Sequence, residues 1–249
     1  IHRPLIMGKD ADGNVSKLSK RHGATGFYDL IDEGYLPEAI INYIALLGWC
    51  PKDNQEIFTL KELEKAFDIS GISKSPAVFD YDKLSWFNGE YIKAMTPEKF
   101  TEVAMPYYKK VFGDKQMPYE KFAAILQKRT TQLTQIPEML DFFAELPSYT
   151  KELFVNKKSK TNLENSPVVL KEAYDRLKAM PEWNETSIHD CLINMAVEKE
   201  LKNGTVMWPV RIAAAGKTVT PGGAVEILDI LGRDESLARL EKGMAILAE

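Results

Sequence analysis

Residues 34–49 have the sequence GYLPEAIINYIALLGW, and this stretch predicts the type of element on which the whole fold is built. Pro37 suits the first turn of a helix, where its missing N–H needs no partner, and Gly48 suits the residue just past a helix end. Between them, apolar residues recur at helical spacing on one face: Ile40, Tyr43, Ile44 and Leu47. This pattern predicts a buried amphipathic helix.

Toward the C-terminus, helical patterns follow one another. Residues 59–62 (TLKE) form a capping box and predict a short helix to about residue 67. Gly204 and Gly232 are predicted helix stops, and Trp49 and Trp86 are predicted core anchors. No alternating pattern typical of strands occurs after residue 95. Further helices are predicted at about 82–88, 96–112, 118–131, 135–145, 149–156, 166–179, 187–202, 208–216, 222–231 and 234–247.

Toward the N-terminus, the pattern changes. Pro4–Met7 is a short apolar run that predicts a strand, and Asp10–Asn14 (DADGN) has the residues of a tight turn. A basic loop follows, so residues 1–25 carry a net charge of about +3 by count of side chains. The predicted fold class is therefore mainly α, with a small mixed α/β module in front of an all-helical region.

Composition excludes several classes of protein. The chain has 249 residues, 45% of them hydrophobic and 27% charged, which is typical of globular domains and not of disordered tails. No run of 18 apolar residues occurs, so we expect no membrane span. The net charge of −4 argues against indiscriminate coating of nucleic acid. Two cysteines are too few for a disulfide framework and favour a reducing, cytoplasmic setting.

The strongest local chemical signal is the basic loop KLSKRHG at residues 17–23. Lys17 and Lys20 lie three apart, with the small Ser19 between them, so their ammonium groups can converge on one anion such as a phosphate chain. Backbone N–H groups of the loop can add donors. Taken alone, the motif is weak, because a basic loop on a protein surface is usually solvated.

The surrounding sequence resembles class I glutamyl-tRNA synthetases of the bacterial type. The basic loop is similar to the family's variant of the K-M-S-K-S loop, with Leu18 in place of Met. Other stretches resemble the family in the same order along nearly the whole chain. They are PLIMGK at 4–9, GYLPEA at 34–39, LLGW at 46–49, SKSPAVFD at 73–80, KLSWFN at 83–88, PVRIA at 209–213 and GGAVEIL at 222–228.

The resemblance implies a two-step ligase. ATP, with its Mg²⁺, and L-glutamate give glutamyl-adenylate, and the glutamyl group then moves to the terminal adenosine of a glutamate-accepting tRNA. In this reading Lys17 and Lys20 are the catalytic residues, and Lys17, Ser19 and Lys20 bind ATP. Lys20 contacts the ATP phosphates, while Lys17 supports the loop or adds charge. Physically, the lysines stabilise the charge that develops on the leaving pyrophosphate.

One departure from the family limits what the chain is expected to do alone. The family's nucleotide-binding domain carries an H-I-G-H-like motif, and none of the three histidines, His2, His22 and His189, lies in such a motif. Zinc cysteines are also absent, so no metal site is expected. We therefore expect a carboxy-terminal part of the enzyme that binds no cofactor by itself and is inactive alone.

The resemblance also implies that successive segments of the chain have different roles. Residues 1–93 carry the loop and a module that contacts the tRNA stem, and 94–164 and 165–249 form two helical anticodon-binding subdomains. Arg129 lies where some family members read the third anticodon base, although an arginine on a solvated helix face fits equally well. Arg211 follows Trp208-Pro209 and either contacts RNA or caps a neighbouring helix.

Two alternatives from other classes of protein remain open. One is a stand-alone helical RNA-binding module, and the other is a helical protein-interaction scaffold. Lys157, Lys158 and Lys160 suit phosphate groups, but the same polar, basic stretch also reads as a solvated linker. For the synthetase reading we expect a cytoplasmic monomer without membrane contact.

Overall fold

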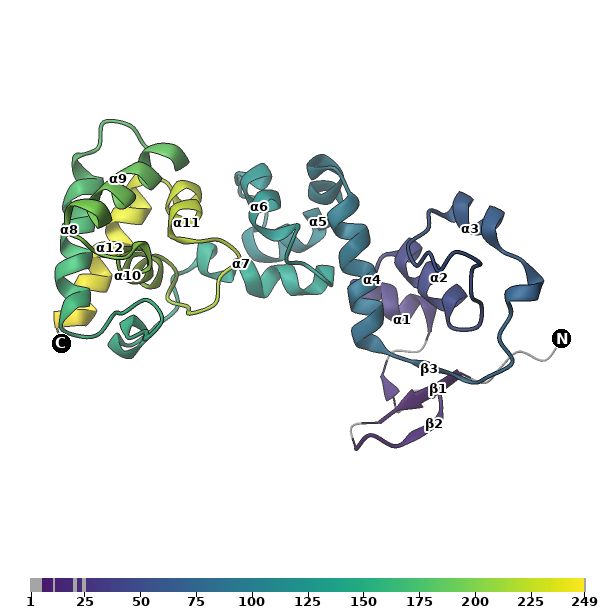
Figure 1. Ribbon diagram of the computed structural model, residues 1–249. Coiled ribbons are helices and arrows are strands. Elements are labelled where there is room, and N and C mark those ends of the chain that lie inside the picture. The colour runs from purple at the N-terminus through teal and green to yellow at the C-terminus, as the bar shows by residue number, and fades with distance from the viewer. Residues whose placement is uncertain (1–5, 11, 20–21, 24–25, 249) are drawn as a thin grey trace. The chain divides into compact units, whose positions relative to one another are not determined.

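The computed structural model describes residues 6–10, 12–19, 22–23 and 26–248. The chain folds into two compact units (Figure 1). Unit 1 comprises Ile1–Tyr107 with Gln127–Ile136, and unit 2 comprises Tyr108–Leu126 with Pro137–Glu249. Within the described ranges, helices dominate and the one three-stranded sheet lies near the N-terminus. The predicted fold class, mainly α with a small mixed module, is confirmed.

The sheet of unit 1 is small and built around β1 (Ile6–Lys9). β2 (Val15–Lys17) pairs with β1 in antiparallel register, and β3 (Ala77–Phe79) pairs with its other edge in parallel register. Figure 1 labels the three strands, with β1 and β2 in purple near the N-terminus and β3, further along the chain, in blue. The sequence predicted β1 but not β3, because three residues are too few for a strand pattern.

The helices of unit 1 pack beside this sheet. They are α1 (Phe27–Asp32), α2 (Pro37–Leu46), α3 (Leu60–Ala66), α4 (Tyr81–Ala94) and the first part of α5 (Pro97–Phe112). Leu30, Ile40 and Phe87 are at most 1% exposed and form the centre of the core. Two predictions were wrong: Ile44 is 43% exposed and Trp86 is 42% exposed, whereas Trp49 is buried as expected.

A buried polar network fixes the loop between α2 and α3. Asn42 Oδ1 accepts from Phe58 N at 2.8 Å and from the Tyr91 hydroxyl at 2.6 Å, while Asn42 Nδ2 donates to Glu56 O at 2.9 Å. The Tyr91 hydroxyl also lies 2.5 Å from Phe58 O. Burial raises the pKa of Tyr91 to about 12. The hydroxyl therefore stays protonated and acts as the donor that joins α4 to this loop.

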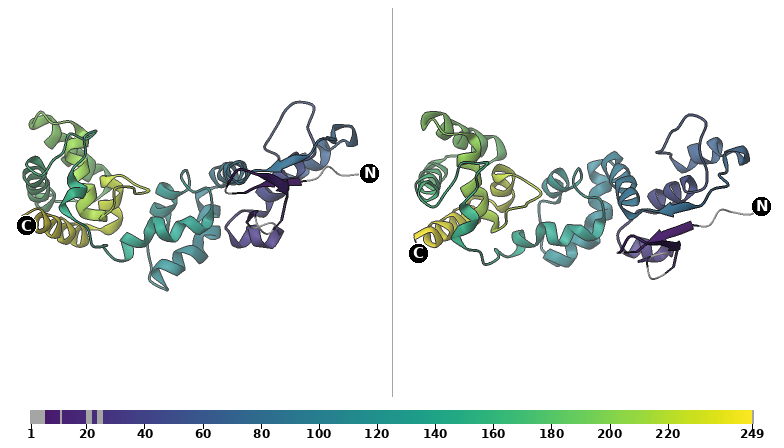
Figure 2. Two further views of the ribbon diagram at one scale, coloured as in Figure 1. Left: turned by 90° about the horizontal axis from the view of Figure 1, so that it is seen from below. Right: turned by 60° about the horizontal axis from the view of Figure 1, so that its bottom comes forward.

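Unit 2 is built around α10 (Asn203–Ala215), which packs against helices α8, α9, α11 and α12. Figure 2 shows these helices at the green and yellow end of the chain. A 3₁₀ turn at Lys151–Phe154 stands where a helix at 149–156 was predicted. The helices of this unit besides α10 are α6 (Tyr119–Leu126), α7 (Ile136–Ala144), α8 (Asn165–Ala179), α9 (Glu185–Glu198), α11 (Ala224–Leu231) and α12 (Arg233–Ala248).

Two features of α10 differ from the sequence prediction. The helix begins at Asn203, so Gly204 lies in its first turn and is not a helix stop, and Pro209 lies inside the helix and not at its start. Gly232 does end α11 with a φ of 77°, as predicted. At its buried face α10 approaches α12 so closely that a Cβ on Gly243 would lie 2.6 Å from Ala213 Cβ. Glycine at 243 therefore sets the separation of these two helices.

A buried arginine adds hydrogen bonds to this packing. Arg239 of α12 is 4% exposed, and its Nη1 donates to Phe142 O at 2.7 Å and to Ala214 O at 2.9 Å. Its Nε donates to Glu235 at 2.6 Å. The guanidinium thus satisfies carbonyls at the ends of α7 and α10. None of the helices in the described ranges is both long and apolar enough to cross a bilayer.

Candidate functional site

The predicted phosphate-binding loop begins at the end of the β1–β2 hairpin. The hairpin turn is held by Asp10, whose Oδ1 accepts from Asn14 N at 2.8 Å and from Asp12 N at 3.0 Å. The hydrogen bond from Asn14 N is the main cause that lowers the pKa of the Asp10 carboxyl. Gly13 takes a φ of 86°, which glycine adopts without strain. This turn fixes the register in which Lys17 pairs with Met7.

Lys17 is the last residue of β2, and its side chain is exposed. Leu18 follows and anchors the chain, because its N–H donates to Ile6 O at 3.0 Å and its side chain packs against the unit 1 core. Ser19 is partly buried. Lys20 and Arg21 lie outside the described residues. Lys17 thus lies at the edge of the sheet, where its side chain is accessible to a ligand in solvent.

His22 holds the loop through three hydrogen bonds. Ser19 N donates to His22 Nδ1 at 3.0 Å, and His22 N donates back to Ser19 O at 2.9 Å. A backbone N–H can only donate, so Nδ1 is the acceptor in the contact with Ser19 N. The other ring nitrogen, Nε2, shares a hydrogen bond with Ser16 Oγ at 3.1 Å. The imidazole therefore bridges the strand before the loop and the turn after it.

The position of the imidazole also depends on Gly8. A Cβ built on Gly8 would lie 2.6 Å from His22 Cγ, a distance that no real packing allows. The ring lies directly against the backbone of β1 for this reason. The sequence reading did not identify His22 as a functional residue. The available signal was a histidine three residues after the loop serine, next to a glycine.

Arg129 lies in the turn that follows α6, and its side chain is exposed. The turn itself is well ordered by its neighbours: Gln127 Nε2 donates to Met95 O at 2.7 Å and to Ile92 O at 3.0 Å. The turn therefore presents Arg129 to solvent from a fixed backbone. This position suits a contact to RNA, and it is equally the position of an ordinary surface arginine.

Arg211 lies in the last turns of α10. Its guanidinium stacks over the Trp208 ring, 4.6 Å from the ring centroid, and Nη2 donates to Thr218 O at 3.0 Å. Trp208 is in turn held by a bond from Nε1 to Leu153 O at 2.9 Å. Through its hydrogen bond to Thr218 O, Arg211 therefore holds in place the segment that follows α10. Lys17 and Arg211 belong to different units.

The structure also bears on metal binding. Within the described ranges, no three His, Cys, Asp or Glu side chains gather closely enough to hold a metal ion. The described residues of the basic loop include no carboxylate: they are Lys17, Leu18, Ser19, His22 and Gly23. The ammonium group of Lys17 attracts anions and repels cations.

Two family models match the chain. Residues 99–244, more than half of the chain, match the model described as an anticodon binding domain. The chain belongs to this anticodon-binding family. Residues 2–86 match a second model, described as the catalytic domain of class I tRNA synthetases (E and Q). The basic loop thus lies in the part that matches a synthetase catalytic domain, and Arg129 and Arg211 lie in the anticodon-binding part.

The chain also has curated relatives that are glutamate–tRNA ligases. One from Clostridium kluyveri is 51% identical over 244 residues, which are 98% of this chain and 49% of the relative. One from Clostridium tetani is 49% identical over the same shares. The chain spans about half the length of these relatives. These relatives confirm the resemblance to glutamyl-tRNA synthetases.

Solved structures agree with the sequence relatives. A crystal structure of a glutamate tRNA ligase from Elizabethkingia meningosepticum, in complex with its amino acid, matches with a TM-score of 0.74 and 28% identity. The match covers 98% of this chain and 46% of that chain. A glutamate–tRNA synthetase from Elizabethkingia anophelis matches with a TM-score of 0.72 and 27% identity. The fold of this chain is therefore the fold of that part of a glutamate–tRNA ligase.

Proposed function

We propose that this chain is the tRNA-binding part of a glutamate–tRNA ligase and supplies the basic loop at residues 17–23 to its active site. The observation that carries the proposal is the order of two family matches on one chain, a catalytic-domain segment at 2–86 followed by an anticodon-binding segment at 99–244. A stand-alone helical RNA-binding module is not favoured, because it has no need of a synthetase catalytic segment.

In the first step, a carboxylate oxygen of L-glutamate attacks the α-phosphorus of ATP, and the bond to the β-phosphate breaks. Pyrophosphate leaves with additional negative charge. We propose that Lys17 and Lys20 stabilise this charge and that Ser19 contributes to the ATP site. Mg²⁺ arrives with ATP as its counter-ion. The bonds of His22 support this role, because they fix the backbone of Ser19, the residue directly before Lys20.

In the second step, a hydroxyl of the terminal adenosine of the tRNA attacks the glutamyl carbonyl, and AMP leaves. We propose that residues 1–93 contact the stem of the tRNA, and that 94–164 and 165–249 bind the anticodon region. Arg129 and Arg211 are the proposed RNA contacts. Stacking on Trp208 orients Arg211 before RNA binds, which lowers the entropy lost on binding. We further propose a cytoplasmic monomer.

The tRNA part of the proposal is tested with the chain itself. We expect a transcript of a glutamate-accepting tRNA to bind, with an affinity that falls steeply between 50 and 200 mM salt, on the order of tenfold or more. Fluorescence anisotropy with labelled tRNA measures this. Absence of binding at low salt would refute the tRNA-binding role.

The catalytic part requires the full-length protein. Lys20→Ala is expected to lower ATP–pyrophosphate exchange by on the order of 10²-fold, because one charge that acts on the transition state is lost. The affinity for tRNA should remain within about twofold. Lys99→Ala, which removes an exposed lysine on α5, is the control. An unchanged exchange rate for Lys20→Ala would show that Lys20 does not act in the first step.

A further inference from the structure

Residues 156–161 form a rigid loop in unit 2, here called the lysine loop. Its ends are joined by two backbone bonds, Asn156 N to Thr161 O at 3.1 Å and Thr161 N to Asn156 O at 3.0 Å. Inside the loop, Asn156 Oδ1 accepts from Ser159 N at 2.9 Å. Lys160 takes a φ of 56°, a left-handed backbone conformation that costs a non-glycine residue on the order of 1 kcal/mol. The segment is a closed turn, not a flexible linker.

Two side chains from later in the chain hold the lysine loop in place. Thr205 Oγ1, in the first turn of α10, donates to Ser159 O at 2.7 Å. Asn165 Nδ2, at the start of α8, donates to Lys160 O at 3.0 Å. The loop is thereby fixed to the N-terminal ends of two long helices. These ends carry partial positive charge, which adds to the charge of the lysines.

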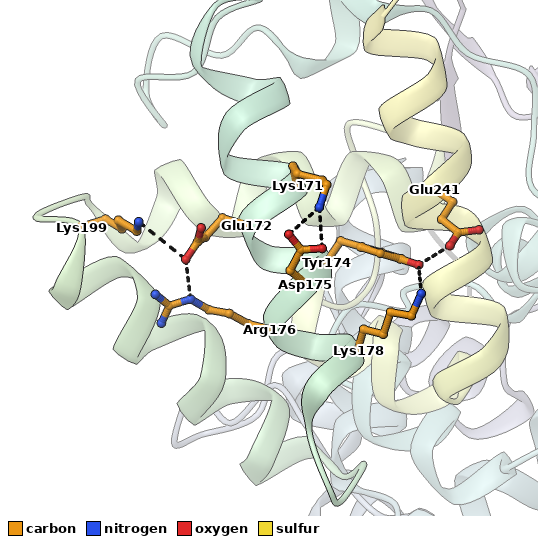
Figure 3. Close-up of polar contacts among 8 residues, drawn as sticks. All are labelled: Lys171, Glu172, Tyr174, Asp175, Arg176, Lys178, Lys199 and Glu241. Carbon is orange, nitrogen blue, oxygen red and sulfur yellow. Dashed lines mark hydrogen bonds and ion pairs between the residues drawn. The ribbon is translucent and has the colours of Figure 1, made fainter.

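The lysine loop carries three exposed positive charges: Lys157, Lys158 and Lys160. Within the described ranges, none of the three ammonium groups has a carboxylate within ion-pair distance. The neighbouring helix α8 differs, as Figure 3 shows. Lys171 of α8 pairs with its neighbour Asp175 at 2.6 Å, and Lys199, the residue that follows α9 (Glu185–Glu198), reaches Glu172 of α8 at 3.6 Å. The charge of these helix lysines is balanced inside the protein, and the charge of the loop is not.

We propose that the lysine loop binds the phosphate backbone of the RNA partner, which rests on the proposed function. Lysine ammonium groups are compact, mobile charges that suit phosphates at varied angles. A fixed backbone loses little entropy when the RNA arrives, so three weak contacts add to a useful affinity. The loop contains no aromatic residue on which a base could stack. The contact is therefore to the backbone and is independent of base sequence.

The test compares two triple variants of the chain with equal changes in net charge. Lys157→Gln/Lys158→Gln/Lys160→Gln removes the loop charges and keeps side-chain length. The matched control neutralises three exposed lysines that already face carboxylates. These are Lys99, which pairs with Glu102, Lys109, which pairs with Asp114, and Lys171, which pairs with Asp175. The probe is a labelled transcript of a glutamate-accepting tRNA, titrated at several salt concentrations.

For the loop variant we expect roughly tenfold or greater loss of affinity at about 100 mM salt. The slope of log affinity against log salt should become flatter by about 2 to 3, since up to three phosphate contacts are lost. A second tRNA that does not accept glutamate should show the same loss. The control should change by less than about twofold. A third variant, with Arg at 157, 158 and 160, keeps the charges and should retain binding.

Three results would overturn the proposal. Equal binding by the wild type and the loop variant would show that the lysine loop does not contact RNA. Equal losses in the loop variant and the control would show that only the overall charge matters. Failure of the wild-type chain to bind tRNA would refute the proposed function as well. A thermal unfolding curve for each variant separates loss of contact from loss of fold.

Discussion

At the scale of single residues, a few side chains with several hydrogen bonds fix the local geometry. Asn42, Tyr91 and Arg239 each bind backbone groups far away in sequence, whereas His22 binds its near neighbours Ser19 and Ser16 and so holds the basic loop. The sequence indicated the basic loop itself, because Lys17 and Lys20 are close together along the chain. It could not indicate the partner of His22, since Gly8 is fourteen positions away and only the strand pairing brings them together.

Tyr91 gives a prediction for both mutation and pH. Tyr91→Phe removes the donor to Asn42 Oδ1 and Phe58 O and should lower the free energy of unfolding at pH 8 by about 1–2 kcal/mol. Because folding raises the pKa of Tyr91 to about 12, from about 10 in the unfolded chain, its stabilisation is complete below pH 10. It is lost as the pH rises toward 12.

Urea unfolding at pH 8 and pH 11 measures this effect. The difference between wild type and Tyr91→Phe should shrink at pH 11, where part of the wild-type advantage has been lost. Tyr28→Phe is the matched control, because Tyr28 is 79% exposed and should change stability little at either pH. A constant difference between wild type and Tyr91→Phe at the two pH values would contradict the assignment.

At the scale of elements, the sequence predicted most helices because apolar residues at helical spacing report burial directly. The errors have physical reasons. The helix predicted at 208–216 has Pro209 in its first turn, where proline is favoured, whereas α10 begins at Asn203 and contains Pro209 in its interior. β3 and α1 are three and six residues long, too short for a periodic pattern. The sequence of the lysine loop predicted a solvated linker, because the hydrogen bonds from Thr205 and Asn165 that order the loop come from other elements.

The contact between α10 and α12 predicts that two Gly→Ala substitutions in unit 2 have opposite effects. Gly243→Ala would place its Cβ 2.6 Å from Ala213 Cβ, so the helices must separate, at a cost of about 1–3 kcal/mol. Gly204→Ala in the first turn of α10 meets nothing closer than 3.6 Å and should be neutral or stabilising by about 0.5–1 kcal/mol. Equilibrium urea unfolding measures both. Destabilisation by Gly204→Ala, or none by Gly243→Ala, would contradict the packing described for α10.

At the scale of the whole molecule, the net charge of −4 is a sum over all side chains and does not show where positive charge is concentrated. Many lysines are neutralised locally by a carboxylate, whereas the lysines of the loop at 156–161 are not. Charge alone therefore did not predict a nucleic-acid partner, and the order of motifs along the chain did. Which side chains touch RNA could not be predicted, because exposure and ion pairing depend on the folded surface.

We expect the chain alone to bind tRNA but to show no ATP–pyrophosphate exchange with glutamate. It spans about half the length of its ligase relatives, and its match to the catalytic-domain model covers residues 2–86. A full-length glutamate–tRNA ligase serves as the positive control in the exchange assay. Exchange above background that is lost in Lys20→Ala would show that the chain holds a complete first-step site.

The left-handed backbone at Lys160 has a consequence for the history of this protein. Glycine adopts a φ of 56° without strain, so a Lys160→Gly change would raise stability while it removes a charge. Mutational drift under selection for folding alone would therefore favour glycine at this position. Competition between cells that carry lysine or glycine at 160 would measure directly whether selection for RNA binding keeps the lysine there.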